Sequence, residues 1–207
     1  MRRGLCWILI EFALGAFLAA MPWAARAQTS GQAVYGGSPR EVSLSVNVTA
    51  SVSASCAFST GAAPSGTYSV GDVEGAYSLD VAFSLRCNSP SRVGVVSDNG
   101  GMKAAGVPSV PAGYAVLAPY QITLSLAGSA GDTASATCES PTLIAGAGGC
   151  VFRGPASATA GLRLPGPSQD APGSFIRISS QGYSDPAILV ASDAYADRLT
   201  VTISPAT

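Results

Sequence analysis

The chain has 207 residues, of which 47% are hydrophobic and 11% charged, with a net charge of −1 and no histidine. This length allows one domain with a packed core and at most a second small one, and the apolar content excludes a mainly disordered chain. The lack of histidine excludes the usual serine and cysteine triads, and no basic stripe suggests a nucleic-acid partner. We therefore expect no enzymatic activity, no catalytic residue, no cofactor and no bound metal.

The first 27 residues have the organisation of a secretory signal peptide. A basic start, Met1-Arg2-Arg3, precedes an apolar run over residues 5–20, and the small-residue site Ala25-Arg26-Ala27 follows. Cleavage is expected after Ala27. The apolar run contains Glu11 and is shorter than the roughly 20 residues that a membrane-spanning helix needs. We expect no transmembrane segment after the signal is removed.

The first long alternation of apolar and polar residues covers residues 42–58 and contains neither glycine nor proline. Side chains of equal parity lie on the same face of a strand. The apolar positions of this parity are Val42, Leu44, Val46, Val48, Val52, Ala54, Cys56 and Phe58. The run is about three times as long as a typical strand. It therefore either bends near Thr49 or has two halves that belong to different bodies, the first half adding itself to a neighbour's open sheet.

The later strands are predicted from similar patterns. Alternations lie at residues 79–87, 120–126 and 199–203, and shorter apolar pieces lie at 93–96, 175–178 and 187–190. The proline-rich stretch 154–173 is expected to be a long surface loop with at most one short strand near Leu162 and Leu164. No segment after the signal has a helical period. The predicted fold class is all-β, an antiparallel β-sandwich of immunoglobulin type.

Four cysteines remain after cleavage: Cys56, Cys87, Cys138 and Cys150. An even number in an exported chain predicts two disulfides. Cys56 and Cys87 share the parity of the core residues in their runs, so we expect the pairs Cys56–Cys87 and Cys138–Cys150. Zinc binding is the alternative, which export and the lack of a C-x-x-C pair disfavour.

Several motifs appear in a fixed order after the signal. The stretch 46–58, which includes Cys56, is followed by 83–87, which includes Cys87, and then by 93–101, 119–124 and 194–203. Together they resemble the spore coat U domains, the pilin domains of archaic chaperone–usher pili. The chain departs from that pattern around Val70-Gly71-Asp72, in its enlarged region around Cys138 and Cys150, and in its end without an aromatic residue.

The resemblance implies an incomplete immunoglobulin-like subunit that is completed by donor-strand exchange. It implies three kinds of partner: a periplasmic chaperone, an outer-membrane usher and neighbouring pilin subunits. The expected organisation is a signal peptide at 1–27, an extension with the donor strand at 28–49 and the domain at 50–207. The expected location is the periplasm in transit and then a fibre on the bacterial cell surface, which supports adhesion or biofilm formation.

The resemblance also assigns roles to particular residues. The inserted donor side chains are expected to be Val42, Leu44, Val46 and Val48, and the acceptor groove is expected to include Leu199, Val201 and Ile203. Without the resemblance, residues 42–48 are equally the first strand of a closed sandwich. An alternative function is a tip or minor adhesin that binds a surface or glycan. A secreted hydrolase with a carboxylate pair, such as Glu74 with Asp80, is a more distant alternative.

Overall fold

The structure is a computed structural model that describes residues 47–107 and 109–206, and the chain divides into two units, residues 1–52 and 53–207. In the first unit the described residues, 47–52, form no strand and are exposed. The exposed fractions of Val48 and Val52 are 81% and 87%. The predicted signal peptide and the predicted donor residues Val42, Leu44 and Val46 lie outside the described residues.

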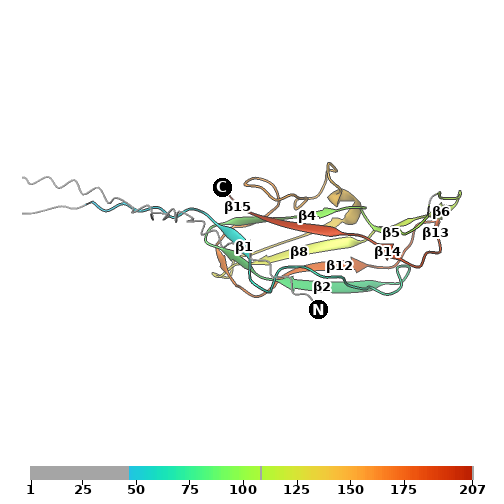
Figure 1. Cartoon of the computed structure of the whole chain (residues 1–207), viewed down its shortest axis with the longest axis horizontal. Coiled ribbons are helices and arrows are strands. Elements are labelled where there is room, and N and C mark those ends of the chain that lie inside the picture. Colours follow the sequence, from blue (N-terminus) through green and yellow to red (C-terminus); the bar gives the residue numbers. More distant parts are fainter. Residues whose placement is uncertain (1–46, 108, 207) are drawn as a thin grey trace, which may run out of the picture. The chain divides into compact units, whose positions relative to one another are not determined.

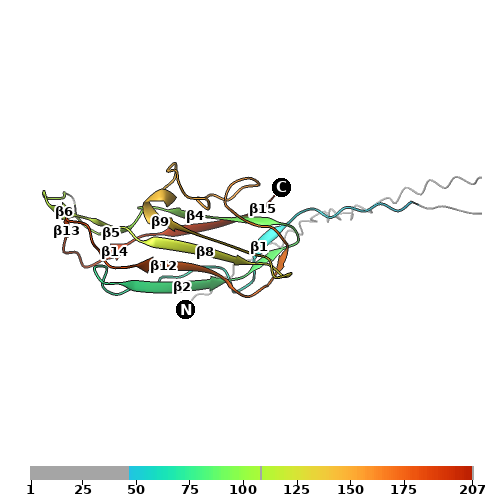
Figure 2. The same ribbon diagram turned by 180° about the vertical axis from the view of Figure 1, so that it is seen from behind.

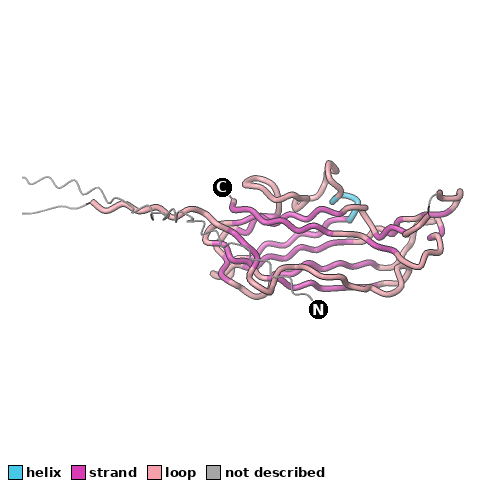
Figure 3. Tube along the Cα trace, viewed as in Figure 1, coloured by secondary structure: helices cyan, strands magenta, loops and turns pink. Residues whose placement is uncertain are grey.

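The second unit consists of strands and loops, as predicted, and its described residues contain one helical element, the 3-10 turn η1 at Ser140–Leu143 (Figure 3). The strands are β1 (Cys56–Phe58), β2 (Tyr77–Phe83), β3 (Leu85–Cys87), β4 (Ser91–Ser97), β5 (Met102–Ala104), β6 (Tyr114–Ala115), β7 (Leu117–Ala118), β8 (Gln121–Ala127), β9 (Thr133–Glu139), β10 (Leu162–Leu164), β11 (Ser168–Gln169), β12 (Ser174–Ser180), β13 (Ile188–Leu189), β14 (Tyr195–Ala196) and β15 (Leu199–Pro205). No helix in the described residues has the length and hydropathy to span a membrane.

Two antiparallel sheets carry most of the second unit (Figure 1). One has four strands in the order β2-β12-β8-β9, and the other has three in the order β10-β4-β15. Figure 2 shows the same arrangement from behind, with β9 beside β8. The smaller sheets are β1-β3-β11 and β14-β5-β7, both antiparallel, and the parallel pair β13-β6.

Both large sheets contribute to one hydrophobic core. In β8 the alternate residues Ile122, Leu124 and Leu126 are fully buried, and in β4 Val93 and Val95 are fully buried as well. The predicted alternation at 79–87 is also confirmed, because its apolar residues are buried or half-buried along β2 and β3 while their neighbours are more exposed. The period of two in the sequence therefore identifies the buried face of each of these strands.

Residues 154–161 cover the outer face of β4. Arg92 donates hydrogen bonds to the carbonyl oxygens of Ala158 and Gly161, at 3.1 and 2.8 Å. Gly94 is needed for this packing, because a Cβ there would lie 2.8 Å from the backbone nitrogen of Ala156. The predicted short strand in the long loop is present as β10, but the prediction of at most one strand there is wrong, because Ser168 and Gln169 form β11 by pairing with β3.

The predicted long run 42–58 gives only a short strand in the described residues. The prediction that Val52 and Ala54 point inward is wrong, because both are exposed and β1 begins only at Cys56. Strand β1 is short because the strand that it pairs with, β3, has only three residues. Just before β1, the Asn88 side chain replaces a partner strand: its Oδ1 atom accepts a hydrogen bond from the Ser55 backbone N–H at 2.8 Å.

Both predicted disulfides are present, which excludes a zinc site made of the four cysteines. Cys56 and Cys87 are direct partners in the register of β1 and β3. Cys138 in β9 is bonded to Cys150, after η1. Disulfides of this kind form in an oxidising compartment outside the cytoplasm.

The two disulfides should differ in their contribution to stability. They close loops with sequence separations of 31 and 12 residues. On the chain-entropy relation, replacing Cys56 and Cys87 by serine should lower the free energy of unfolding by about 4 kcal/mol, and replacing Cys138 and Cys150 by about 3 kcal/mol. Denaturant titration of the two double variants measures the difference. A larger loss at Cys138 and Cys150 would contradict the chain-entropy account.

Candidate strand-binding groove

Strand β15 has one paired edge and one free edge. It pairs along its whole length with β4, and no other described strand pairs with it. Its predicted groove residues Leu199, Val201 and Ile203 are half-buried and pack against the core. An edge strand of seven residues presents a row of unpaired backbone groups, to which another extended segment can add.

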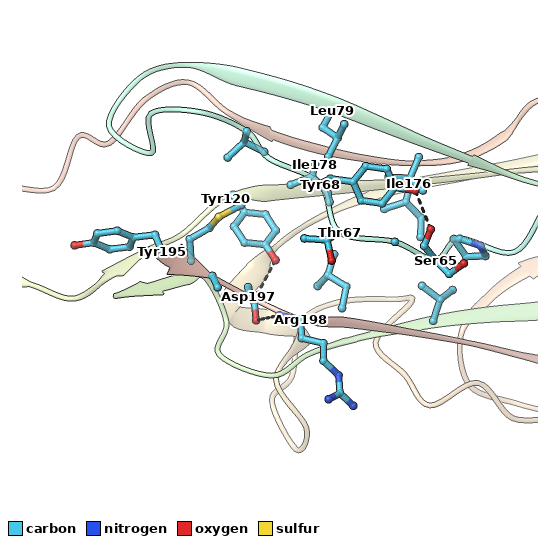
Figure 4. Close-up of a pocket in the computed structure, with 18 residues that line it drawn as sticks. Ser65, Thr67, Tyr68, Leu79, Tyr120, Ile176, Ile178, Tyr195, Asp197 and Arg198 are labelled. Carbon is cyan, nitrogen blue, oxygen red and sulfur yellow. Dashed lines mark hydrogen bonds between the residues drawn. The ribbon is translucent and has the colours of Figure 1, made fainter. Parts of the chain in front are cut away.

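A pocket of about 500 Å³ lies beside β15 (Figure 4). Leu199 and Val201 of β15 line it on one side. The other sheet contributes apolar side chains from two strands, namely Leu79 and Val81 of β2 and Ile176 and Ile178 of β12. The pocket therefore lies between the two sheets, next to the unpaired backbone of β15, with apolar side chains on both of these walls and polar groups elsewhere in its lining.

The segment 64–70, which we call the strap, lines the same pocket with all of its residues except Ser69. In Figure 4 Thr67 lies between Ile178 on one side and Asp197 and Arg198 on the other. The Tyr68 hydroxyl donates to the carbonyl oxygen of Ser65 at 3.0 Å, so the strap is folded on itself.

The carboxylate of Asp197 holds the end of the groove together. Its Oδ2 atom accepts hydrogen bonds from the Ser97 hydroxyl at 2.6 Å and the Tyr120 hydroxyl at 2.7 Å. Its Oδ1 atom accepts from the backbone N–H groups of Asn99 and Arg198, at 3.0 and 2.8 Å. One side chain therefore ties the segment before β15 to β4 and to the start of β8.

The chemistry of Tyr120 fits a structural role. The side chain is 3% exposed, and burial, followed by the hydrogen bond to Asp197, raises the pKa of its hydroxyl well above the usual range. The phenol therefore stays protonated and keeps donating to the Asp197 carboxylate.

The structure places the predicted site residues as follows. Leu199 and Val201 line the pocket together, whereas Ile203 lies further along β15 and does not line it. Val48 is exposed in the first unit, and the other three predicted donor residues lie outside the described part of the chain.

Among the carboxylates of the hydrolase alternative, Asp80 is paired with Arg177, which donates to both of its oxygens at 2.6 and 2.7 Å. This hydrogen bonding lowers the pKa of Asp80. A glycosidase acid needs a raised pKa, so Asp80 is poorly suited to that role. No group of three histidine, cysteine, aspartate or glutamate residues in the described part of the chain could hold a metal ion.

Neither the strap nor the opposite wall of the pocket was predictable from the sequence. Leu79 and Val81 were predicted to be core residues, but parity alone gives the face of a strand and not the element that lies across from it. Comparisons with protein-family models, with curated proteins and with solved structures find no match for this chain. Because no relative indicates a function, the function is inferred from the groove beside β15.

Proposed function

We propose that this chain is a structural subunit of a secreted surface fibre that assembles by donor-strand complementation. In this account an incomplete immunoglobulin-like sandwich accepts an extended segment from a neighbouring subunit. The observation that carries the proposal is the free edge of β15 beside a pocket of about 500 Å³ that has apolar side chains of both sheets on its walls.

The groove suits a strand whose side chains alternate between apolar and polar. Its backbone would pair with β15, while every second side chain would enter the pocket between β15 and the wall formed by β2 and β12. Each apolar side chain that becomes buried contributes about 1.5–3 kcal/mol. An alternating segment would therefore satisfy both the unpaired edge and the apolar space.

The chain itself contains a segment with this pattern. Residues 41–48 read Glu-Val-Ser-Leu-Ser-Val-Asn-Val, with apolar residues at every second position. The donor is thus proposed to be this segment of a second copy or of a related subunit. A predicted signal peptide and two disulfides support export, after which a periplasmic chaperone would hold the unfilled groove and an outer-membrane usher would receive the subunit.

A charge in the groove tests the proposal from the acceptor side. Val201→Asp would place a carboxylate opposite the apolar wall of β2 and β12, where an inserted strand would bury it, so the variant should not accept a strand. Thr200→Asp is the matched control, because Thr200 is exposed on the same strand. Electron microscopy and sedimentation should show fibres from Thr200→Asp and none from Val201→Asp, with thermal melts to confirm that both fold.

Mixing Val201→Asp with the wild-type chain gives a second test of the proposed acceptor. A Val201→Asp chain still has its own donor segment, so it should bind to the open end of a growing wild-type fibre and stop further addition there. A small fraction of the variant should therefore shorten the fibres. Fibres of normal length from the mixture, or from Val201→Asp alone, would contradict the proposed acceptor.

A further inference from the structure

We propose that residues 64–70 are a displaceable strap, which covers the groove of a subunit that has no donor and moves aside when a strand enters. This inference rests on the proposed function, because it concerns how the same groove is filled. Three features of the strap support it: its lack of hydrogen bonds to the sheets, its internal folding and its position.

Hydrogen bonds join the strap to the rest of the fold only through residues on either side of it. On the amino-terminal side, the carbonyl oxygen of Ala62 accepts a hydrogen bond from the Ser84 backbone N–H at 3.1 Å. On the carboxyl-terminal side, the carbonyl oxygen of Glu74 accepts from the Tyr183 backbone N–H at 3.0 Å. Within the described part of the chain, every hydrogen bond of residues 64–73 is to a residue of that stretch or to the adjacent Glu74. Moving the strap therefore breaks no hydrogen bond to either sheet.

The strap also holds its own shape. The Tyr68 ring folds back towards Gly66, where a Cβ would lie 3.3 Å from the ring atoms, and its hydroxyl is bonded to Ser65. Tyr68 is 48% exposed. The segment can thus move as one compact piece, because its internal contacts do not depend on the groove.

The position of the strap brings it into conflict with a strand in the groove. Thr67 lies between the apolar wall at Ile178 and Arg198, the residue just before β15 (Figure 4). A strand added to the free edge of β15 would pass through this space. The entering strand would replace a segment without hydrogen bonds to β15 by one that pairs with it, so the exchange is favourable.

The test measures how fast a groove binds a donor peptide. The receiving protein is the chain without its signal peptide that carries Leu44→Asp and Val46→Asp, so that its own extension stays out of neighbouring grooves. The probe is a labelled synthetic peptide of residues 40–49. Tyr68→Ala loosens the strap, and Tyr114→Ala is the matched control, because Tyr114 is an exposed tyrosine outside the groove lining.

Tyr68→Ala should raise the association rate of the peptide roughly fivefold or more, because a larger fraction of the molecules has an open groove. Tyr114→Ala should leave the rate unchanged. In the protein with an intact strap, chymotrypsin should cut after Tyr68 faster when the peptide is bound, because the strap is then displaced.

Different failures lead to different conclusions. Equal association rates for Tyr68→Ala and Tyr114→Ala would overturn the strap proposal alone, and so would slower chymotrypsin cleavage when peptide is bound. A faster dissociation in Tyr68→Ala without faster association would show that the strap clamps a bound strand, which also overturns displacement. If the peptide binds to no variant, the proposed function fails and the strap proposal fails with it.

Discussion

Replacing Leu44 and Val46 by aspartate is expected to abolish fibre assembly while the single subunit still folds. In the proposed fibre both side chains enter an apolar groove, and each introduced carboxylate would be buried there without a partner. The loss also includes the burial of two apolar side chains, at about 1.5–3 kcal/mol each. Electron microscopy should show no fibres, and the thermal melt of the monomer should match that of the unaltered monomer.

Two controls separate donation from folding. Ser43→Asp with Ser45→Asp places the same charges at the opposite parity, where they face away from the groove, and fibres should still form. In a chain with residues 41–48 repeated after Thr207, the groove is filled from within, so Leu44→Asp with Val46→Asp should leave its melting temperature unchanged. An equal loss of stability in that chain would mean that residues 42–48 are the subunit's own first strand.

Removing the Asp197 carboxylate is expected to cause the second large effect, on stability. Asp197→Ala leaves the buried hydroxyls of Ser97 and Tyr120 without their acceptor. At about 1–3 kcal/mol for each unpaired buried group, the free energy of unfolding should fall by roughly 2–6 kcal/mol. The melting temperature should fall by about 2–4 °C per kcal/mol, as measured by calorimetry.

Asp193→Ala is the matched control for this prediction, because Asp193 is exposed and the structure gives its carboxylate no hydrogen bond among the described residues. Tyr120→Phe should cost less than Asp197→Ala, since Asp197 then keeps its hydrogen bonds from Ser97, Asn99 and Arg198. If Asp197→Ala were as stable as Asp193→Ala, the network would not hold the end of the groove.

The strands that sequence analysis predicted best have large apolar residues at alternate positions. The runs at 120–126 and 199–203 became β8 and β15, and the piece at 93–96 became the middle of β4. In each of these strands a large side chain at every second position shows where the core must lie. The disulfide pairs followed from the same parity argument, because Cys56 lies directly opposite Cys87.

Strand β9 was missed because its inward residues are small. Its sequence, Thr-Ala-Ser-Ala-Thr-Cys-Glu, places Ala134, Ala136 and Cys138 towards the core, and these give little apolar contrast with serine and threonine. Its position beside β8 is decided by pairing with that strand over seven residues, which is a tertiary effect. The same kind of effect explains the wrong prediction for Val52 and Ala54, whose alternation has no partner strand to bury it.

Only the β15 wall of the groove could be predicted from the sequence, because the opposite wall is also set by tertiary packing. Leu199 and Val201 stand out in the last strand, but the wall made by Leu79 and Ile176 depends on how the two sheets pack. The strap carries no periodic signal, because residues 64–70 contain proline, glycine and short polar side chains. Its place beside β15 is visible only once the chain is folded.

Hydrogen exchange along β15 tests the central proposal most directly. In a monomer, β15 pairs only with β4, so the backbone amides of residues 199–204 should be protected at alternate positions. In the fibre, a donor strand on the free edge should protect the remaining amides as well. Strand β9 is the internal control, because it is also an edge strand and should keep its alternate pattern. Continuous protection of β15 in fibres is the predicted result, and an alternate pattern that persists there would contradict the account.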